Sequence, residues 1–403
     1  GYDSSGLATM EFDNEILRNR QIGKVANLVD EVTKLDLSGT LGIAHTRWAT
    51  HGSVLVENTH PHMSGDHLAL VHNGIIENNQ VLKAQLQGIG YQFASDTDSE
   101  VIVHLIDSHL KEGFSLVEAV RKSVKRLDGA YAIAVICADS PDRLIAARSG
   151  CPLVIGKGIG ENFVASDVLA LQAVTDRFIF LEEGDLVELT SDTIDIWNVE
   201  NSSIIRADIK VEVGIDDLDK GQFRHFMEKE IFAQPGVLKE SIGARLGRDR
   251  VLEQAFGIES KRVFDQVDAI TIAACGTSFY AASVARYWIE DLVGIPCNVE
   301  IASEFRYRKS AVLPNSLFVT ISQSGETADT LAALRLSKNA GFFASLTICN
   351  VSTSSMVRES DLSLLLQIGS EIGVASTKAF SAQLVNLFLL SILLGRRKGL
   401  TQE

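Results

Sequence analysis

The spacing of hydrophobic and polar positions differs between two regions in the first half of the chain. Apolar residues recur every three or four positions over Asp98 to Leu110 and over Ser115 to Leu127, which predicts two amphipathic helices. Tyr131 to Val199 instead contains short β-rich runs separated by turn residues, the pattern of antiparallel strands. Helices beside such strands predict a layered α+β domain.

The second half repeats a unit of strand, turn and helix. After a polar, acidic segment that starts near Gly214, strands such as AITIAA and LFVTI alternate with helices, the last over Thr377 to Leu394. This alternation predicts an α/β domain with a parallel, doubly wound sheet. The change in composition predicts domains over 1–213 and 241–403, joined by a linker over 214–240.

Composition disfavours several classes of protein. The chain has 403 residues and 37 basic against 52 acidic side chains, and its net charge of −15 would repel nucleic acid. The most apolar stretch, Leu384 to Leu394, is too short to span a bilayer and contains Asn386, so we expect a buried helix and no membrane partner.

The five cysteines lie far apart, which favours a reducing, cytoplasmic setting. No CxxC and no helical histidine pair with a carboxylate occurs, so no metal is expected.

Three turns in the second half share one design, in which a strand ends, Ser, Thr or Gly follows, and a helix begins. They are CGTS at 275–278, SQSGET at 322–327 and VAST at 374–377. At the carboxyl edge of a parallel sheet, helix amides and hydroxyls can surround an anion. SQSGET contains no Lys or Arg, which favours a monophosphate over the phosphates of a nucleotide P-loop. The alternative is simple helix capping by Ser and Thr.

A second group of candidate residues lies in the first half of the chain. Within HTRWATHG, Arg47 could bind a carboxylate through two parallel hydrogen bonds. Asn73 and Gly74 could stabilise an oxyanion, and Asp98 could pair with an ammonium. Together they predict a pocket for an amino acid with a reactive carbonyl. In the alternative interpretation, Arg47 and Asp98 form surface salt bridges and Asn73-Gly74 is a hairpin turn.

In this order, the motifs resemble the glutamine:fructose-6-phosphate aminotransferases (isomerizing), also called glucosamine-6-phosphate synthases. The resemblance covers essentially the whole chain, from GYDSSGLA, GIAHTRWATHG and VHNGIIEN to ACGTS, ISQSGETADTL and EIGVASTKAF. It implies an N-terminal-nucleophile amidotransferase domain that hydrolyses glutamine and passes ammonia to a sugar isomerase (SIS) domain. There, fructose 6-phosphate would be aminated and isomerized to glucosamine 6-phosphate in hexosamine biosynthesis.

The resemblance also implies roles for individual residues. In the glutamine site these are Arg47 for the α-carboxylate, Thr50 and His51 beside it, Asp98 for the ammonium, Asn73 and Gly74 for the oxyanion hole, and Trp48 for gating ammonia. The residues implied for the sugar phosphate are Thr277, Ser278, Ser322, Gln323, Ser324, Thr327 and Val374. No cofactor is implied, and the intact enzyme is expected to form a homodimer or a larger assembly.

Two departures from the family pattern concern the ends of the sequence. The family nucleophile is a cysteine at the start of the mature chain, whereas this sequence opens at Gly1. The chain also stops at Glu403, before any match to the family's second SIS subdomain. We therefore expect an internal fragment without turnover. The alternatives are a non-catalytic module that binds sugar phosphate and an amidotransferase with a different acceptor.

Overall fold

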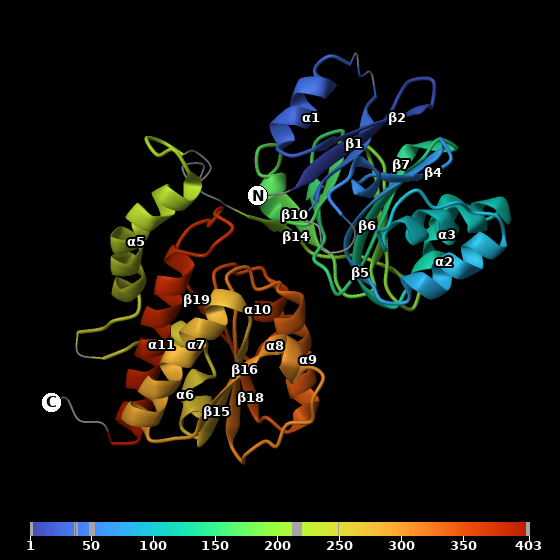
Figure 1. Cartoon of the computed structure of the whole chain (residues 1–403). Coiled ribbons are helices and arrows are strands. Elements are labelled where there is room, and N and C mark those ends of the chain that lie inside the picture. The colour runs from blue at the N-terminus through green and yellow to red at the C-terminus, as the bar shows by residue number, and fades with distance from the viewer. Residues whose placement is uncertain are drawn as a thin grey trace. The chain divides into compact units, whose positions relative to one another are not determined.

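The chain forms two compact units. The structure is a computed structural model that describes residues 3–35, 37, 39–47, 53–211, 220–248 and 250–399. Unit 1 comprises Gly1–Val213 and unit 2 comprises Gly214–Glu403. Each is described by itself below, with the element labels of Figure 1.

Unit 1 is built on antiparallel sheets. Its described strands are β1 (Ser4–Met10), β2 (Ile16–Ile22), β3 (Leu41–Arg47), β4 (His62–Ser64), β5 (Leu68–Ile76), β6 (Gly129–Cys137), β7 (Ser140–Ser149), β8 (Val154–Lys157), β9 (Asn162–Ala165), β10 (Arg177–Phe180), β11 (Leu186–Leu189), β12 (Ile194–Trp197), β13 (Ser203–Ile204) and β14 (Asp208–Lys210). They pair in the orders β13-β12-β11-β7-β6-β5-β4, β2-β1-β3 and β14-β10-β8-β9. The antiparallel prediction is therefore confirmed.

Helices cover one face of the largest sheet, and the smaller sheets pack against its other face. These helices are α2 (Asn79–Gly88), α3 (Glu100–Lys111) and α4 (Leu116–Val124), whereas α1 (Val25–Val32) packs against β1 and β2 of a smaller sheet. Leu105 of α3 shares a core with Ile133 of β6, while Ala134 of β6 shares a second core with Ala8 of β1. Because β5 and β6 are covered on both faces, they contain apolar residues at successive positions. The layered α+β prediction holds.

Unit 2 is a parallel, doubly wound sheet, as predicted. Its strands are β15 (Ala269–Ala274), β16 (Cys297–Ile301), β17 (Ser316–Ile321), β18 (Ala344–Cys349) and β19 (Leu362–Leu365), in the order β16-β15-β17-β18-β19. Its described helices are α5 (Phe226–Gly243), α6 (Ser260–Phe264), α7 (Gly276–Trp288), α8 (Ala302–Phe305), α9 (Ala328–Ala340), α10 (Ser355–Glu359) and α11 (Lys378–Arg397). In Figure 1, α5, α7 and α11 lie on one side of this sheet and α8, α9 and α10 on the other.

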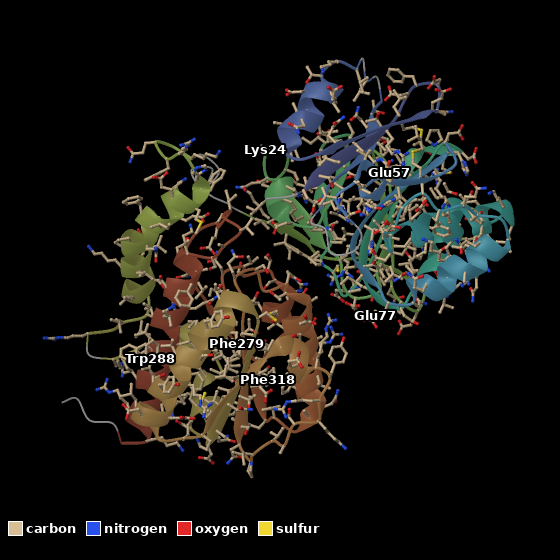
Figure 2. All side chains as sticks on the ribbon, in the orientation of Figure 1. Lys24, Glu57, Glu77, Phe279, Trp288 and Phe318 are labelled. Atoms are coloured by element: carbon tan, nitrogen blue, oxygen red, sulfur yellow. The ribbon has the colours of Figure 1, made fainter. Side chains whose placement is uncertain are left out.

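Each face of the parallel sheet has its own core. Alternate residues of β17 point to opposite faces, so Val319 packs towards α7 and α11, while Phe318 packs towards α8 and α9. Phe318 lies 5.0 Å from Phe305 and 4.8 Å from Phe342 between ring centroids, and Figure 2 marks its position. Both faces are therefore covered, as a parallel sheet requires.

The longest helix, α11, explains the apolar stretch Leu384 to Leu394. By length and composition α11 could cross a membrane, but 67% of its apolar window is buried within unit 2. The prediction of a buried helix is confirmed. Helix α5, which packs against α11, begins at Phe226, inside the segment 214–240 that was expected to be a linker.

The strand order of unit 2 reverses between β15 and β17. The chain runs from β15 to β16 on one side, and then returns to place β17 on the other side of β15. Ligands of open parallel sheets bind outside the carboxyl ends of the strands at such a reversal. Ala274 pairs with Ile321 at these ends, so the turns 275–278 and 322–327 are neighbours.

Candidate functional sites

A cavity of about 690 Å³ opens in unit 1 and collects four of the predicted residues. Its walls come from β1, β3, β5, β6 and the segment before α3, and they include Arg47, Asn73, Gly74 and Asp98. Arg47 and Asp98 are far apart in sequence, yet they line one space with Asn73 and Gly74. The other predicted residues of this site lie outside the described residues: Trp48, Thr50 and His51.

Arg47 ends β3 and turns its side chain inward. Strand β3 pairs with β1 so that Arg47 lies opposite Ser4, and the arginine is 4% exposed. Its Nη1 lies 3.5 Å from Oδ1 of Asp3 and 3.4 Å from the carbonyl oxygen of Ser53. Arg47 therefore forms an ion pair with Asp3, but its guanidinium is buried in the cavity wall and is not part of a surface salt bridge.

Asp98 is held in the cavity wall by a hydrogen bond from the backbone of β5. Its Oδ2 accepts the N–H of Ile76 at 2.7 Å, and the residue is 6% exposed. Among the described residues its Oδ1 has no hydrogen-bond partner, so that oxygen can accept from an ammonium placed in the cavity. Asp98 is thus a buried, anchored carboxylate rather than a surface one.

Asn73 and Gly74 lie within a strand, so the hairpin-turn alternative is wrong. Strand β5 continues through both residues to Ile76 and pairs with β6. The Oδ1 of Asn73 lies 2.7 Å from Nε2 of His45. An Nε2–H that donates to Oδ1 leaves the amide N–H groups of Asn73 to donate to a ligand, as an oxyanion site requires.

Sequence reasoning missed a group of buried histidines beside these residues. The ring centroid of His60 lies 4.2 Å from that of His45, 4.6 Å from that of His62 and 6.5 Å from that of His72. Burial lowers the pKa of His45 and of His60, lowers that of His62 to about 3 and lowers that of His72 to about 4. The available signal was the placement of eight of the nine histidines before residue 110. In the described part of the chain, no three His, Cys, Asp or Glu side chains are arranged to hold a metal.

In unit 2, the turn after β17 is closed by its own hydroxyls. The Oγ of Ser322 accepts the N–H of Gly325 at 3.0 Å and lies 2.9 Å from Oγ1 of Thr327. Ser324 Oγ accepts the N–H of Glu326 at 3.2 Å. Gly325 has φ +70°, and a Cβ there would lie 2.2 Å from Oγ of Ser354, so only glycine fits this bend. The predicted Gln323 lies in the same turn.

The turn after β15 presents a helix start without a side-chain cap. Neither Cys275 before α7 nor Thr327 before α9 caps its helix through its side chain. The capping-only interpretation therefore fails for both turns, and the first-turn amides remain available to an anion. Thr277 is exposed at this start, whereas Ser278 is buried, and its Oγ lies 3.1 Å from Nε2 of Gln383.

The third turn differs from the other two. Glu371 Oε1 accepts the N–H of Thr377 at 2.9 Å and that of Ala379 at 3.0 Å. A carboxylate of the chain therefore already occupies the start of α11, and the prediction that all three turns offer helix amides to an anion is wrong here. Val374, at the tip of this turn, is 70% exposed.

Comparison with known proteins gives consistent matches over both units. A glutamine amidotransferase domain profile matches residues 45–173, and a SIS domain profile matches residues 264–393. The glutamine–fructose-6-phosphate aminotransferase (isomerizing) of Pseudomonas putida is 57% identical over 399 residues, 99% of this chain and 65% of that protein. The protein of the same name from Photorhabdus laumondii is 54% identical over 403 residues, 100% of this chain and 66% of that protein.

A solved structure matches part of the chain. The C-terminal domain of glucosamine-fructose-6-phosphate aminotransferase from Francisella tularensis is 47% identical and covers 46% of this chain and 52% of that one, with a TM-score of 0.45. The chain spans 65–66% of the length of the two relatives named above. With its amidotransferase and SIS domains in this order, the chain belongs to the glutamine–fructose-6-phosphate aminotransferase family.

Proposed function

We propose that unit 1 binds L-glutamine and unit 2 binds fructose 6-phosphate, as parts of an enzyme that forms glucosamine 6-phosphate and glutamate. The observation that carries this proposal is the shared cavity of Arg47, Asp98, Asn73 and Gly74. The names of the relatives support the choice of the two substrates.

In the proposed glutamine complex, the charges of the cavity match those of an α-amino acid. The Arg47 guanidinium binds the α-carboxylate, and the free Oδ1 of Asp98 accepts from the α-ammonium. The side-chain amide then reaches Asn73 and Gly74. When a nucleophile attacks that amide its oxygen becomes negative, and donors placed beforehand at that position lower the barrier.

In the proposed sugar-phosphate complex, uncharged donors hold the phosphate. The hydroxyls of Ser322, Ser324, Thr327 and Thr277 and the first-turn amides of α7 and α9 surround the carboxyl ends of β15 and β17. The helix starts carry partial positive charge, which compensates for the lack of Lys or Arg within these turns.

The glutamine part of the proposal is tested by Arg47→Lys. Lysine keeps the charge but cannot form two parallel hydrogen bonds, so we expect the affinity for L-glutamine in calorimetric titration to fall about 10- to 100-fold. The matched control is Arg177→Lys on β10, whose guanidinium pairs with Asp208 and is absent from the cavity wall. If the two variants bind L-glutamine with equal affinity, Arg47 does not belong to the glutamine site.

The phosphate part is tested by Ser322→Ala. The substitution removes both a donor to the phosphate and the acceptor for the Gly325 N–H, so we expect fructose 6-phosphate affinity to fall about tenfold. Titration of the same variant with L-glutamine is the internal control, because that site lies in unit 1, and its affinity should not change. If fructose 6-phosphate binds Ser322→Ala as tightly as the unaltered chain, the phosphate lies elsewhere.

A further inference from the structure

The segment between β19 and α11 crosses the carboxyl edge of the parallel sheet. Near its start, the carbonyl oxygen of Gly369 accepts from Nδ2 of Asn350, which follows β18. Beyond its end, Gln383 of α11 contacts Ser278, which follows β15. Because β17 lies between β18 and β15, residues 371–377 pass beside the turns assigned to the sugar phosphate.

We propose that Glu230 of α5 is a positioning residue that fixes the loop 371–377 over the sugar part of the proposed fructose 6-phosphate site. This inference rests on the function proposed above. Glu230 is 4% exposed, and its Oε1 accepts the N–H of Ile372 at 2.6 Å and that of Gly373 at 3.0 Å. A carboxylate that accepts two backbone N–H groups holds them more strongly than a neutral acceptor would.

The fit between Glu230 and the loop is close. A Cβ on Gly373 would lie 2.5 Å from Oε2 of Glu230, and 3.5 Å from Cα of Met227 on the same helix. A side chain at position 373 would therefore displace the Glu230 carboxylate from its present place. The contact joins residues 143 positions apart, so it arises from the fold of unit 2 and not from local turn geometry.

A second carboxylate fixes the other end of the same loop. Glu371 accepts from the N–H groups of Thr377 and Ala379 through Oε1, and from Oγ of Ser376 at 3.0 Å through Oε2. The loop is therefore attached to α5 at one end and to α11 at the other. The exposed Val374 lies between the two attachments, where the loop can contact a sugar.

Lys378 places a positive charge near the buried Glu230 carboxylate. Both residues line a cavity of about 220 Å³ between α5, the segment after β19 and the start of α11. Lys378 is 5% exposed and has no ion-pair partner among the described residues. Its ammonium partly offsets the cost of burying a carboxylate whose Oε2 also lacks a hydrogen-bond partner there.

Loss of the Glu230 carboxylate should affect the binding of fructose 6-phosphate and of inorganic phosphate differently. Inorganic phosphate would contact only the turns after β15 and β17, whereas fructose 6-phosphate would also contact the loop. We therefore expect Glu230→Ala to weaken fructose 6-phosphate binding about tenfold and to leave inorganic phosphate binding unchanged. Glu230→Gln keeps the shape and an acceptor oxygen, so its effect should be smaller.

The experiment measures both affinities by calorimetry and the amide hydrogen exchange of Ile372 and Gly373. Glu240→Ala is the matched control, because Glu240 lies on α5 and lines the same cavity without a hydrogen bond to the loop among the described residues. We expect these two amides to exchange faster in Glu230→Ala than in the unaltered chain. In Glu230→Gln the rates should lie between the two, and in Glu240→Ala they should equal those of the unaltered chain.

Several results would overturn the inference. Unchanged exchange at Ile372 and Gly373 would show that Glu230 does not hold the loop, and equal losses for both ligands would indicate general damage to unit 2. Should Glu230→Ala not fold, the same comparison is made with Glu230→Gln. If the unaltered chain binds no fructose 6-phosphate, the proposed function fails, whereas faster exchange in the variant would still show that Glu230 holds the loop.

Discussion

Unit 1 is expected to lose stability steeply as the pH falls from about 6.5 to 4, because the buried histidines must become charged. Burial lowers the pKa of His62 to about 3 and that of His72 to about 4 from an ordinary value of 6.5, and it also lowers those of His45 and His60. Between the folded and ordinary values the unfolded chain binds more protons, so the free energy of unfolding decreases as the pH falls.

The expected size of this effect follows from the number of histidines involved. Each contributes about 1.4 kcal/mol per pH unit within its own window, so two or more can remove several kcal/mol by pH 5. Glu100 adds a loss only at lower pH: burial raises its pKa, but hydrogen bonds from His104, Ser95 and Ala94 outweigh this and lower it to about 2. The stability contributed by Glu100 is therefore lost only below its ordinary value of 4.5.

Hydrogen exchange at pH 7 and pH 5, corrected for intrinsic exchange rates, measures the loss of stability separately in each unit. Amides of β5 and β6 report on unit 1, and amides of β15 and β17 report on unit 2. Unit 2 contains one histidine of the sequence, His225, and it does not belong to the cluster, so unit 2 is an internal control. If protection falls equally in both units between these pH values, the histidine cluster is not the cause.

Gly74→Ala is expected to destabilise unit 1 by about 3 kcal/mol or more, because the alanine forces β5 and β6 apart. Gly74 has φ +137°, and a Cβ there would lie 2.0 Å from the carbonyl oxygen of Ala130 and 2.9 Å from Cα of Tyr131. Both contacts are with backbone atoms of the paired strand, which a side-chain rotation cannot relieve.

Urea unfolding compares this variant with Gly88→Ala. Gly88 ends α2, and a Cβ there meets nothing within 4 Å, so alanine should leave stability unchanged or raise it by up to about 1 kcal/mol. Unfolding midpoints that coincide for Gly74→Ala and Gly88→Ala would show that the strands do not lie as close as described.

The sequence was sufficient to predict features that repeat in local patterns. Apolar residues at every third or fourth position predicted α3 and α4 to within two residues at their starts. Alternating strands and helices predicted the parallel sheet, and the turns at 275–278 and 322–327 followed because strands of such a sheet end at one edge.

Features that depend on contacts between distant residues could not be predicted in this way. The turn 374–377 resembles the other two in sequence, but Glu371 occupies its helix amides and Glu230 holds the residues before it. His60 and His72 line the same cavity of unit 1 although they come from separate segments, and nothing near His72 in sequence indicates that they meet. Asn73-Gly74 has the composition of a hairpin turn and lies in a strand because β6 pairs with it.

A calorimetric cycle tests whether Arg47 and Asp98 bind the two opposite charges of one glutamine molecule. The unaltered chain and Asp98→Asn are each titrated with L-glutamine and with glutaramic acid, which lacks only the α-ammonium. We predict that the unaltered chain prefers glutamine by about 10- to 100-fold and that Asp98→Asn binds both ligands equally. A preference for glutamine that persists in Asp98→Asn would show that Asp98 does not bind the α-ammonium.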